Sequence, residues 1–352
     1  MKNSTILLII IIINFYSCFS QGRKFKVVTV AFYNLENLFD TANDPITFDD
    51  DRTPDGSDHW TEENYRDKLN NMATVISKIG KSVSGGPPAL LGVAEVENRK
   101  VLDDLINQPQ LASFNYGVVH YDSPDRRGID VALLYRKEIF TPVRSSAHEL
   151  EIYAYDDAAK RAYTRDQLLV KGVLDESEIY VIVNHWPSRS GGEELSSVRR
   201  EAAAQLNRKI VDSILNQNPY AKLITMGDLN DDPTNKSVSQ VLGAKQNRES
   251  LNEKDLYNPM YNMYLNGAGT LAYRDSWNLF DQIILSAPLI EKEYDDYTFY
   301  RAGIFNEPFV SSASGQYKGY PFRSYANGTY TGGYSDHYPV YIYLIKEVAG
   351  ED

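Results

Sequence analysis

The sequence predicts one layered domain of the α+β or α/β class, and three observations lead to this prediction. The chain has 352 residues, 42% of them hydrophobic and 24% charged, which is a globular composition with enough apolar material for a sizeable core. Short β-branched and aromatic runs recur along the chain, whereas long helical periods occur in few places. We see no internal repeat and no linker, so we expect a single domain over residues 21–352.

The first part of this domain is predicted to contain a strand, a loop and a helix. Lys26–Phe32 is short, β-branched and aromatic, as in a buried strand, and residues 41–59 form an acidic segment rich in Pro, Thr and Gly. Thr61 is placed to cap a helix, and Gly-Gly-Pro-Pro at residues 85–88 ends the helical region. The apolar residues at helical spacing are Leu69, Met72, Val75, Ile76 and Ile79.

Strands dominate the remainder of the chain. A second long helix is predicted at Ser196–Asn216, and residues 252–278 show no clear period, which predicts a loop with short irregular elements. The other predicted elements are strands: Ala89–Ala94, Tyr116–His120, Asp130–Tyr135, Leu168–Leu174, Tyr180–Asn184, Leu223–Met226, Gln282–Leu285 and Tyr338–Leu344.

Residues 1–20 are typical of an export signal. Lys2 precedes an apolar run from Ile6 to Ile13, and Cys18-Phe19-Ser20 then leads to Gln21. Cleavage before Gln21 and lipidation of Cys18 are the two processing alternatives, so we expect a secreted or cell-envelope protein. The apolar run is too short to span a bilayer, and no later segment approaches the required length.

The charge of the chain is acidic, with 36 Lys+Arg against 48 Asp+Glu and a net charge of −12. A protein that holds a phosphate polymer by bulk charge is expected to be basic, so the charge disfavours that class. Phosphate chemistry would therefore depend on local groups such as a bound metal ion. The single cysteine excludes an intrachain disulfide framework and a multi-cysteine zinc site.

Acidic, amide and histidine side chains recur at the ends of the predicted strands. Strand ends of a layered fold converge on one rim, so these groups predict a shared cleft. Carboxylate, amide and imidazole without thiol suit a hard cation, Mg²⁺, Mn²⁺ or Ca²⁺, beside a base-activated water. The pattern therefore predicts a metal-assisted hydrolase. Its residues are Asn34, Glu36, Glu95, Asp130, Asn184, His185, Asp228, Asn230, Asp281, Asp336 and His337.

Together these motifs resemble those of the endonuclease/exonuclease/phosphatase superfamily, whose members cleave phosphate esters with a divalent metal. The similarity runs from Val27 to Tyr343, and its most specific segments are Gly227-Asp228-Leu229-Asn230 and Ser335–Val340. The resemblance implies an α/β, four-layered sandwich in which two mixed β-sheets pack face to face and helices flank them.

The resemblance also implies roles for the residues that match. His337 corresponds to the general base that activates the attacking water, and Asp281 to the carboxylate that orients it. The implied metal ligands are Glu95, Asn34, Asp336 and, as a looser match, Glu36. The residues matched to the nucleophile, the scissile phosphate or the leaving oxygen are Asp228, Asn230 and His185.

Several charged residues near these motifs have competing interpretations. Arg127 and Arg189 are candidate contacts for a substrate phosphate, and an ordinary surface arginine is the alternative for each. Glu97 competes with Glu95, but only one of the two can face the cleft if the segment is extended. The histidines that match no motif are expected in loops or at the surface: His59, His120 and His148.

Export disfavours repair and signalling roles inside a cell. The Ser335–Val340 segment is most similar to secreted deoxyribonucleases, so the leading expectation is a secreted, metal-dependent nuclease that cleaves DNA or RNA. The alternative is a phosphodiesterase or phosphatase acting on a lipid headgroup, like a sphingomyelinase, or on a small phosphorylated metabolite. A catalytically inactive binding module is a third interpretation, which the filled catalytic positions disfavour. We expect a monomer.

Overall fold

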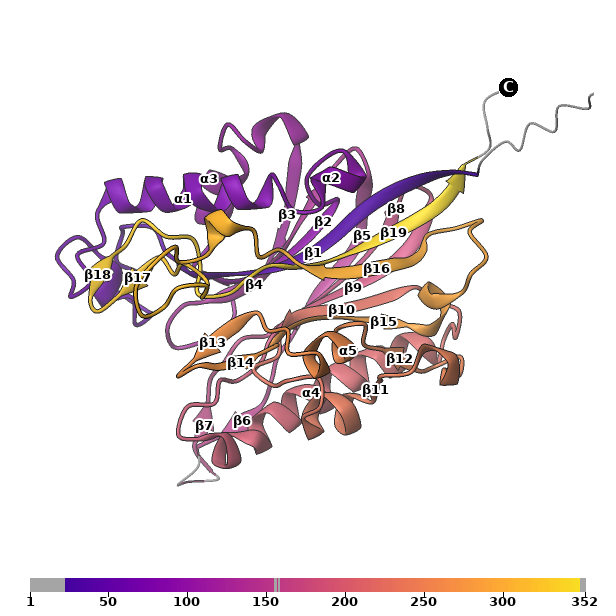
Figure 1. Ribbon diagram of the computed structural model, residues 1–352. Helices are drawn as coiled ribbons and strands as arrows, with labels where there is room; N and C mark the ends of the chain where they lie inside the picture. Colours follow the sequence, from indigo (N-terminus) through magenta and orange to yellow (C-terminus); the bar gives the residue numbers. More distant parts are fainter. Residues whose placement is uncertain (1–22, 155–156, 158, 349–352) are drawn as a thin grey trace, which may run out of the picture.

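The computed structural model describes residues 23–154, 157 and 159–348, and two β-sheets face each other at its centre (Figure 1). The predicted signal peptide and Cys18 lie outside the described residues. The first sheet has the order β16-β19-β1-β2-β4-β3. Its strands are β1 (Lys24–Leu38), β2 (Leu90–Val96), β3 (Tyr116–His120), β4 (Asp130–Arg136), β16 (Thr298–Ile304) and β19 (Val340–Val348).

The second sheet has seven strands in the order β11-β12-β15-β10-β9-β8-β5. They are β5 (Phe140–His148), β8 (Gln167–Leu174), β9 (Ser177–His185), β10 (Leu223–Asp228), β11 (Ala244–Lys245), β12 (Leu256–Tyr257) and β15 (Asp281–Ser286). Three short hairpins lie outside both sheets: β6–β7 (Ile152–Tyr153 and Arg161–Ala162), β13–β14 (Leu271–Tyr273 and Ser276–Asn278) and β17–β18 (Tyr325–Ala326 and Thr329–Tyr330).

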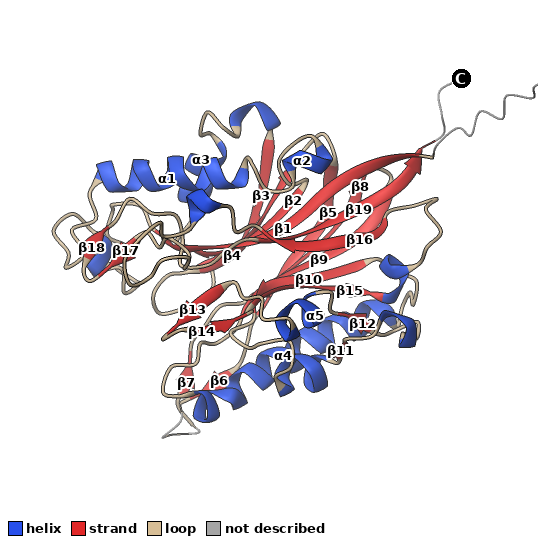
Figure 2. Ribbon diagram, viewed as in Figure 1, coloured by secondary structure: helices blue, strands red, loops and turns tan. Residues whose placement is uncertain are grey.

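Helices cover the outer faces of the two sheets (Figure 2). One group lies on the six-stranded sheet: α1 (Glu62–Ile76), α2 (Lys81–Ser84) and α3 (Arg99–Ile106). The other lies on the seven-stranded sheet: α4 (Glu193–Leu215) and α5 (Met260–Leu265). The α/β four-layered sandwich of two mixed sheets is therefore confirmed.

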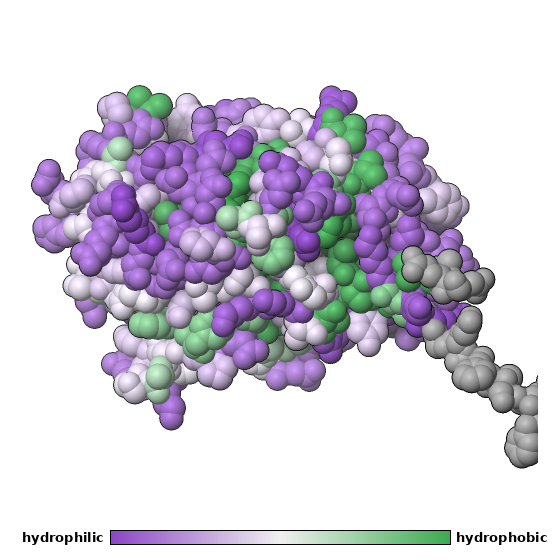
Figure 3. Space-filling view, turned by 90° about the horizontal axis from the view of Figure 1, so that it is seen from above, coloured by the Kyte–Doolittle hydropathy of each residue, from purple (hydrophilic) through white to green (hydrophobic). Residues whose placement is uncertain are grey.

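Three hydrophobic clusters correspond to the three interfaces between layers. The first fills the space between the sheets, with Phe32 from one sheet and Met226 from the other among its members. The second joins the six-stranded sheet to α1 and α3, and the third joins the seven-stranded sheet to α4. Seen from the side of α1, the surface is mostly hydrophilic (Figure 3). No helix in the described part of the chain has the length and apolarity needed to cross a membrane.

The strand pairing explains why polar residues gather at one rim. Each sheet has a central parallel pair, β1 with β2 and β9 with β10, so the carboxyl ends of four strands meet at the same end of the sandwich. The antiparallel neighbours β4, β15 and β19 begin at that end. In register, Asp228 pairs with both His185 and Asp281.

Most of the predicted elements are confirmed, with differences in their bounds. Thr61 caps α1, because its side chain accepts a hydrogen bond from the backbone N–H of Asn64. The first strand was predicted too short: β1 continues to Leu38 and contains Asn34 and Glu36. Among the elements that the sequence reasoning did not predict are β5, α3 and β16. They are partly polar and form through pairing and packing with distant segments.

Gly92 sets the distance between the two sheets. A Cβ atom there would lie 2.9 Å from Met226 Sδ, 3.1 Å from Phe32 Cδ2 and 3.2 Å from Val183 Cγ1. We expect Gly92→Ala to lower the free energy of unfolding by about 1–3 kcal/mol through overpacking, measured by urea unfolding. Gly86→Ala is the control, because the nearest atom there, at 3.0 Å, is the flexible end of Arg136. Equal stability of the two variants would contradict this account.

Candidate active site

Eight predicted site residues lie together at the rim. They come from both sheets: Asn34 (β1), Glu95 (β2), His185 (β9), Asp228 (β10), Asn230 after β10, Asp281 (β15), and Asp336 and His337 just before β19. Asn34 Nδ2 donates to Asp228 Oδ2 at 3.1 Å, which joins the two halves. His185 Nε2 lies 3.6 Å from Asp228 Oδ2 and 3.8 Å from Glu95 Oε1. The structure thus brings these eight residues together at one rim of the sandwich.

The backbone at this rim departs from regular strand geometry. Glu36, Asn37, Glu95 and Asn230 have φ angles of 48°, 55°, 60° and 50°, in the left-handed region that non-glycine residues rarely adopt. The β1–β2 and β2–β4 registers shift at the same places, as in β-bulges. Such bulges redirect side chains, so Glu95 and Glu97 do not simply alternate as in an extended strand.

His337 and Asp281 form a buried pair across the sandwich. His337 Nδ1 lies 2.7 Å from Asp281 Oδ2, and Nε2 of the same ring lies 3.9 Å from Asp228 Oδ2 and 3.9 Å from Asp336 Oδ1. Burial acts to lower the pKa of His337, but the charge of Asp281 and its hydrogen bond outweigh it and raise the pKa well above the usual value. Asp281 thus fixes the ring orientation and stabilises its protonated form.

Asp228 lies between the imidazoles of His185 and His337, whose pKa values shift in opposite directions. Burial raises the pKa of Asp228 to about 6, with the charge of His337 opposing this and that of Asp281 adding to it. Burial, together with the charges of Arg165 and Arg127, lowers the pKa of His185 well below its usual value. The ring of His185 is therefore neutral near pH 7, and its buried Nδ1 has no hydrogen-bond partner among the described residues. One histidine is thus suited to hold a proton and the other to remain neutral.

Glu95 and its neighbours have the donor chemistry of a hard-cation site. Glu95 Oε2 accepts a hydrogen bond from the backbone N–H of Asn37 at 3.0 Å, which leaves Oε1 toward His185. The side chains of Glu95 and Asp336 are 16% and 35% exposed, so both are accessible from solvent. Oxygen-rich groups without thiol fit Mg²⁺, Mn²⁺ or Ca²⁺. Asp228, Asp281 and His337 also approach within cation-binding range, but Asp281 is committed to His337.

Glu36 lies beside this cluster but is held by other groups. Its Oε2 accepts hydrogen bonds from the backbone N–H of Ser324 at 2.5 Å and from Ser324 Oγ at 2.8 Å, and its Oε1 lies 3.4 Å from Arg323 Nε. Burial and the charge of Asp336 raise the pKa of Glu36 to about 7. The buried Lys68 donates to the backbone carbonyl of Glu36 at 2.6 Å. These contacts fix the strained turn that follows Asn34.

The two candidate phosphate contacts have different surroundings. Arg189 donates to the Asn230 carbonyl at 3.0 Å, pairs with Asp231, Asp232 and Glu193, and lies over the Phe280 ring. Its guanidinium is therefore engaged within the protein. Arg127 is half exposed, and its charge contributes to the low pKa of His185.

Two predicted acidic and amide positions have roles in packing. Glu97 accepts a hydrogen bond from the backbone N–H of Asp40 at 2.6 Å, so it holds the loop that follows β1. Burial raises the pKa of Glu97 to about 8. Asn184 Nδ2 donates to Thr225 Oγ1 at 2.9 Å and to the Met226 carbonyl at 3.0 Å, and its Oδ1 accepts from Asn207 of α4 at 3.1 Å, so it lies between the seven-stranded sheet and α4.

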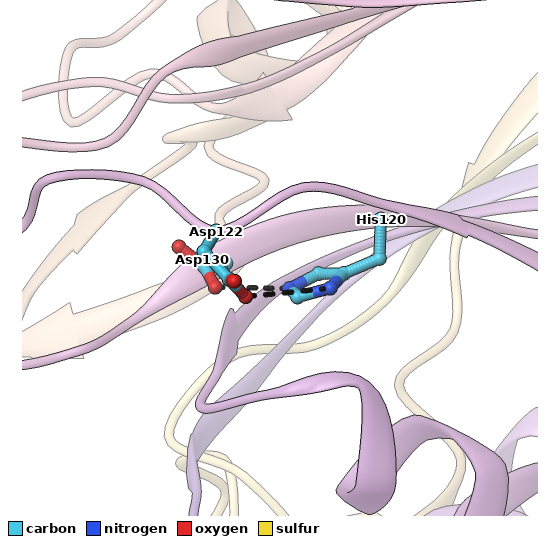
Figure 4. Close-up of side chains that lie close together, drawn as sticks. All are labelled: His120, Asp122 and Asp130. Carbon is cyan, nitrogen blue, oxygen red and sulfur yellow. Dashed lines mark hydrogen bonds and ion pairs between the residues drawn. The ribbon is translucent and has the colours of Figure 1, made fainter. Parts of the chain in front are cut away.

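The expectation that His120 lies in a loop or at the surface is wrong. His120 ends β3, its side chain is 4% exposed, and its Nε2 lies 2.9 Å from Asp130 Oδ2 (Figure 4). Asp130 also accepts the backbone N–H of Ser123 at 2.7 Å. Asp130 starts β4 two residues before Ala132, the register partner of His120, so the two side chains meet diagonally across the strand pair and the buried imidazole has a carboxylate partner. His59 is exposed, and His148 is half-buried beside Ser146.

Arg165 is a buried residue near the site that the sequence reasoning missed. It donates to Asp125 Oδ2 at 3.0 Å and to the Trp186 carbonyl at 2.6 Å, and its charge contributes to the low pKa of His185. Asn230 Nδ2 donates to the same carbonyl at 3.0 Å. Arg165 belongs to no motif, and its role arises from a contact 40 residues distant in sequence, between Arg165 and Asp125.

A sandwich of two sheets with carboxylate, amide and imidazole groups at one rim defines a metal-dependent phosphoesterase. A sequence profile described as Endonuclease/Exonuclease/phosphatase family matches residues 29–346. The chain belongs to this family, as its motifs predicted. A search of curated protein sequences finds no match.

Solved structures share this fold at low sequence identity. TDP2 from D. rerio, complexed with a single strand DNA product, is 13% identical with a TM-score of 0.54, covering 90% of this chain and 98% of its own. A family protein from Bacteroides thetaiotaomicron is 17% identical with a TM-score of 0.54, covering 94% and 99%. Mannosyl-6-phosphatase from Bacteroides thetaiotaomicron is 18% identical with a TM-score of 0.52, covering 90% and 99%. At these identities the likeness shows the fold.

Replacement of His337 tests its predicted role as the base. We expect His337→Ala to lower kcat by about 10²–10⁴-fold, because a general base contributes that factor, while the protein remains folded. The measurement is steady-state hydrolysis of bis(p-nitrophenyl) phosphate with saturating Mg²⁺ or Mn²⁺, with circular dichroism to verify folding. His148→Ala removes a half-buried histidine in β5 and should retain full activity. An unchanged rate in His337→Ala would remove His337 from this role.

Replacement of Asp281 tests the electrostatic coupling. The Asp281 carboxylate raises the pKa of His337, so Asp281→Asn should lower that pKa. Activity that requires the neutral imidazole rises as His337 loses its proton, so the acid limb of the kcat/KM profile should move to lower pH in Asp281→Asn. The plateau should fall as well, because the protonated ring loses its partner. A limb that stays in place, or moves to higher pH, would contradict the coupling.

Proposed function

We propose that the protein is an exported phosphodiester hydrolase that cleaves DNA or RNA with a divalent cation. The observation that carries this proposal is the His337–Asp281 pair, whose free nitrogen faces Asp228 at 3.9 Å across the sandwich. A histidine so oriented and a carboxylate beside it form the arrangement needed to activate a water. Export rests on the signal predicted for residues 1–20.

In this proposal the site residues have separate roles in the in-line attack of water on the phosphodiester. His337 accepts a proton from the attacking water at Nε2, and Asp281 stabilises the resulting charge. Asp228 and Asn230 orient the nucleophile, and Asn230 is itself fixed by the Trp186 carbonyl.

His185, neutral and close to Glu95 and Asp228, contacts the scissile phosphate or the leaving oxygen. Arg127 adds a phosphate contact, whereas the pairs of Arg189 make it a support for the loop after β10.

The cation has a defined set of candidate ligands. Glu95 is the main one, with Asn34 and Asp336 beside it, while Glu36 acts through Ser324 and Arg323 to fix the adjacent turn. A bound Mg²⁺ or Mn²⁺ would supply Lewis-acid polarisation of the phosphate oxygens.

A second candidate function is hydrolysis of a smaller phosphate ester. The net charge of −12 disfavours tight binding of a long polyanion and favours a lipid headgroup or a phosphorylated metabolite as substrate. The mannosyl-6-phosphatase that shares the fold acts on a substrate of the latter kind by its name.

A substrate panel separates the two candidates. We expect the purified protein to degrade DNA or RNA with Mg²⁺ or Mn²⁺, to lose this activity with EDTA, and to lose it in His337→Ala, which also controls for contaminating nucleases. The panel contains plasmid DNA, single-stranded DNA, RNA, sphingomyelin and mannose 6-phosphate, followed by gel electrophoresis and phosphate release. Hydrolysis of sphingomyelin or mannose 6-phosphate without any nucleic-acid cleavage would overturn the nuclease proposal in favour of the second candidate.

A further inference from the structure

A groove of about 580 Å³ lies between the loop that follows β1 and the loop that precedes β4. The two loops are joined by a hydrogen bond from the backbone N–H of Phe48 to the carbonyl of Arg126 at 2.8 Å. Thr47 packs against Gly128, where a Cβ atom would lie 2.9 Å from the Thr47 methyl group. The groove is lined by Asn37, Phe39, Phe48, Asp51, Arg52, Asp58, Arg126 and Arg127.

The groove adjoins the candidate active site. Asn37 lines the groove, and its backbone N–H holds Glu95 Oε2 at 3.0 Å. Arg127 lines it as well, and its charge acts on His185. Asp125 links Arg127 to Arg165, since it lies 3.6 Å from Arg127 Nε and 3.0 Å from Arg165 Nη1. A substrate whose phosphate lies between Glu95 and His185 would have this groove beside it.

The lining combines a ring surface with guanidinium groups. Phe48 is 63% exposed, although it is a large apolar side chain, and the Arg126 guanidinium lies 4.4 Å from the centre of its ring. Arg126 forms no ion pair with any described residue, whereas Arg52 is paired with Asp58 at 2.8 Å. The groove is thus lined by three arginines and two aspartates, in a chain with a net charge of −12.

We propose that this groove binds the nucleotide adjacent to the scissile phosphate, with its base unpaired; this inference rests on the proposed nuclease function. The exposed Phe48 ring and the guanidinium above it provide stacking surfaces for a base, and Arg126 and Arg127 provide contacts for its phosphate. A base that stacks on a protein ring has left its own helix, so the groove selects single-stranded nucleic acid over duplex. A volume of about 580 Å³ falls within the range of small-ligand sites.

Two substitutions in the groove test the inference. We expect Phe48→Ala and Arg126→Ala each to raise KM for a single-stranded oligodeoxynucleotide about tenfold, with kcat nearly unchanged, because one stacking or phosphate contact is lost. Hydrolysis of bis(p-nitrophenyl) phosphate, which is too small to occupy the groove and the catalytic site together, should be unchanged. The wild-type protein should cleave the single strand with a higher kcat/KM than the matching blunt duplex.

The controls are exposed residues of the same types outside the groove. Tyr220→Ala removes a side chain that is 65% exposed, and Arg144→Ala an exposed arginine of β5. Neither should change KM for the oligonucleotide.

If the wild type cleaves nucleic acid but the groove variants keep its KM, the inference fails while the proposed function stands. If no nucleic acid is cleaved, both fail, and a loss of mannose 6-phosphate hydrolysis in the groove variants would assign the groove to a sugar phosphate.

Discussion

Two hydrogen bonds that cross from one sheet to the other hold the catalytic groups in a common geometry. Asn34 from the six-stranded sheet donates to Asp228 in the seven-stranded sheet, and Asp281 in the seven-stranded sheet pairs with His337 before β19 of the other. Neither sheet carries a complete site by itself. The separation of the sheets, set where Gly92 lies against Met226, therefore determines whether these groups meet. The packing of the core therefore also sets the distances between the catalytic groups at the rim.

Bringing these groups together costs electrostatic free energy that the fold must offset. Asp228 and Asp281 are direct cross-strand partners, and like charges at such positions repel. Burial and the charges of neighbouring carboxylates raise the pKa of Asp228 and that of Asp336, although His337 opposes both shifts. A cluster of this kind is stabilised by positive charge, which His337 supplies from within and a divalent cation at Glu95 would supply from outside. Left-handed backbone at Glu36, Asn37 and Glu95 adds to the strain, as is common where side chains are aimed for function.

The sequence was informative where local pattern and position in the fold agree. Short apolar runs that end in Asp, Asn, Glu or His located the central strands and the rim, because residues after parallel strands converge whatever their distance in sequence. It failed where a residue's environment depends on a distant partner. His120 is buried because Asp130 lies on the adjacent strand, and Arg189 is engaged because the loop after β10 folds back on it. Arg165 became visible only through contacts with Asp125 and Trp186. These pairings depend on tertiary geometry, and no spacing in the chain encodes them.

The acidic composition is compatible with the proposed nucleic-acid substrate, because charge is distributed unevenly over the fold. Much of the acid near the rim faces the candidate cation site, where a divalent ion would neutralise it. The loop after β1 is itself acidic, yet Asp49 accepts the backbone N–H of Asp44 and Asp58 is paired with Arg52, so these carboxylates are engaged within the loop. Arg126 and Arg127 line the groove together with Asn37, whose backbone N–H donates to Glu95. A few local cations beside a metal site suit a short segment of substrate better than a long duplex, whose many phosphates would also meet the acidic surface. Under the proposed function, the overall charge limits the length and form of the substrate, while the groups at the rim determine the chemistry.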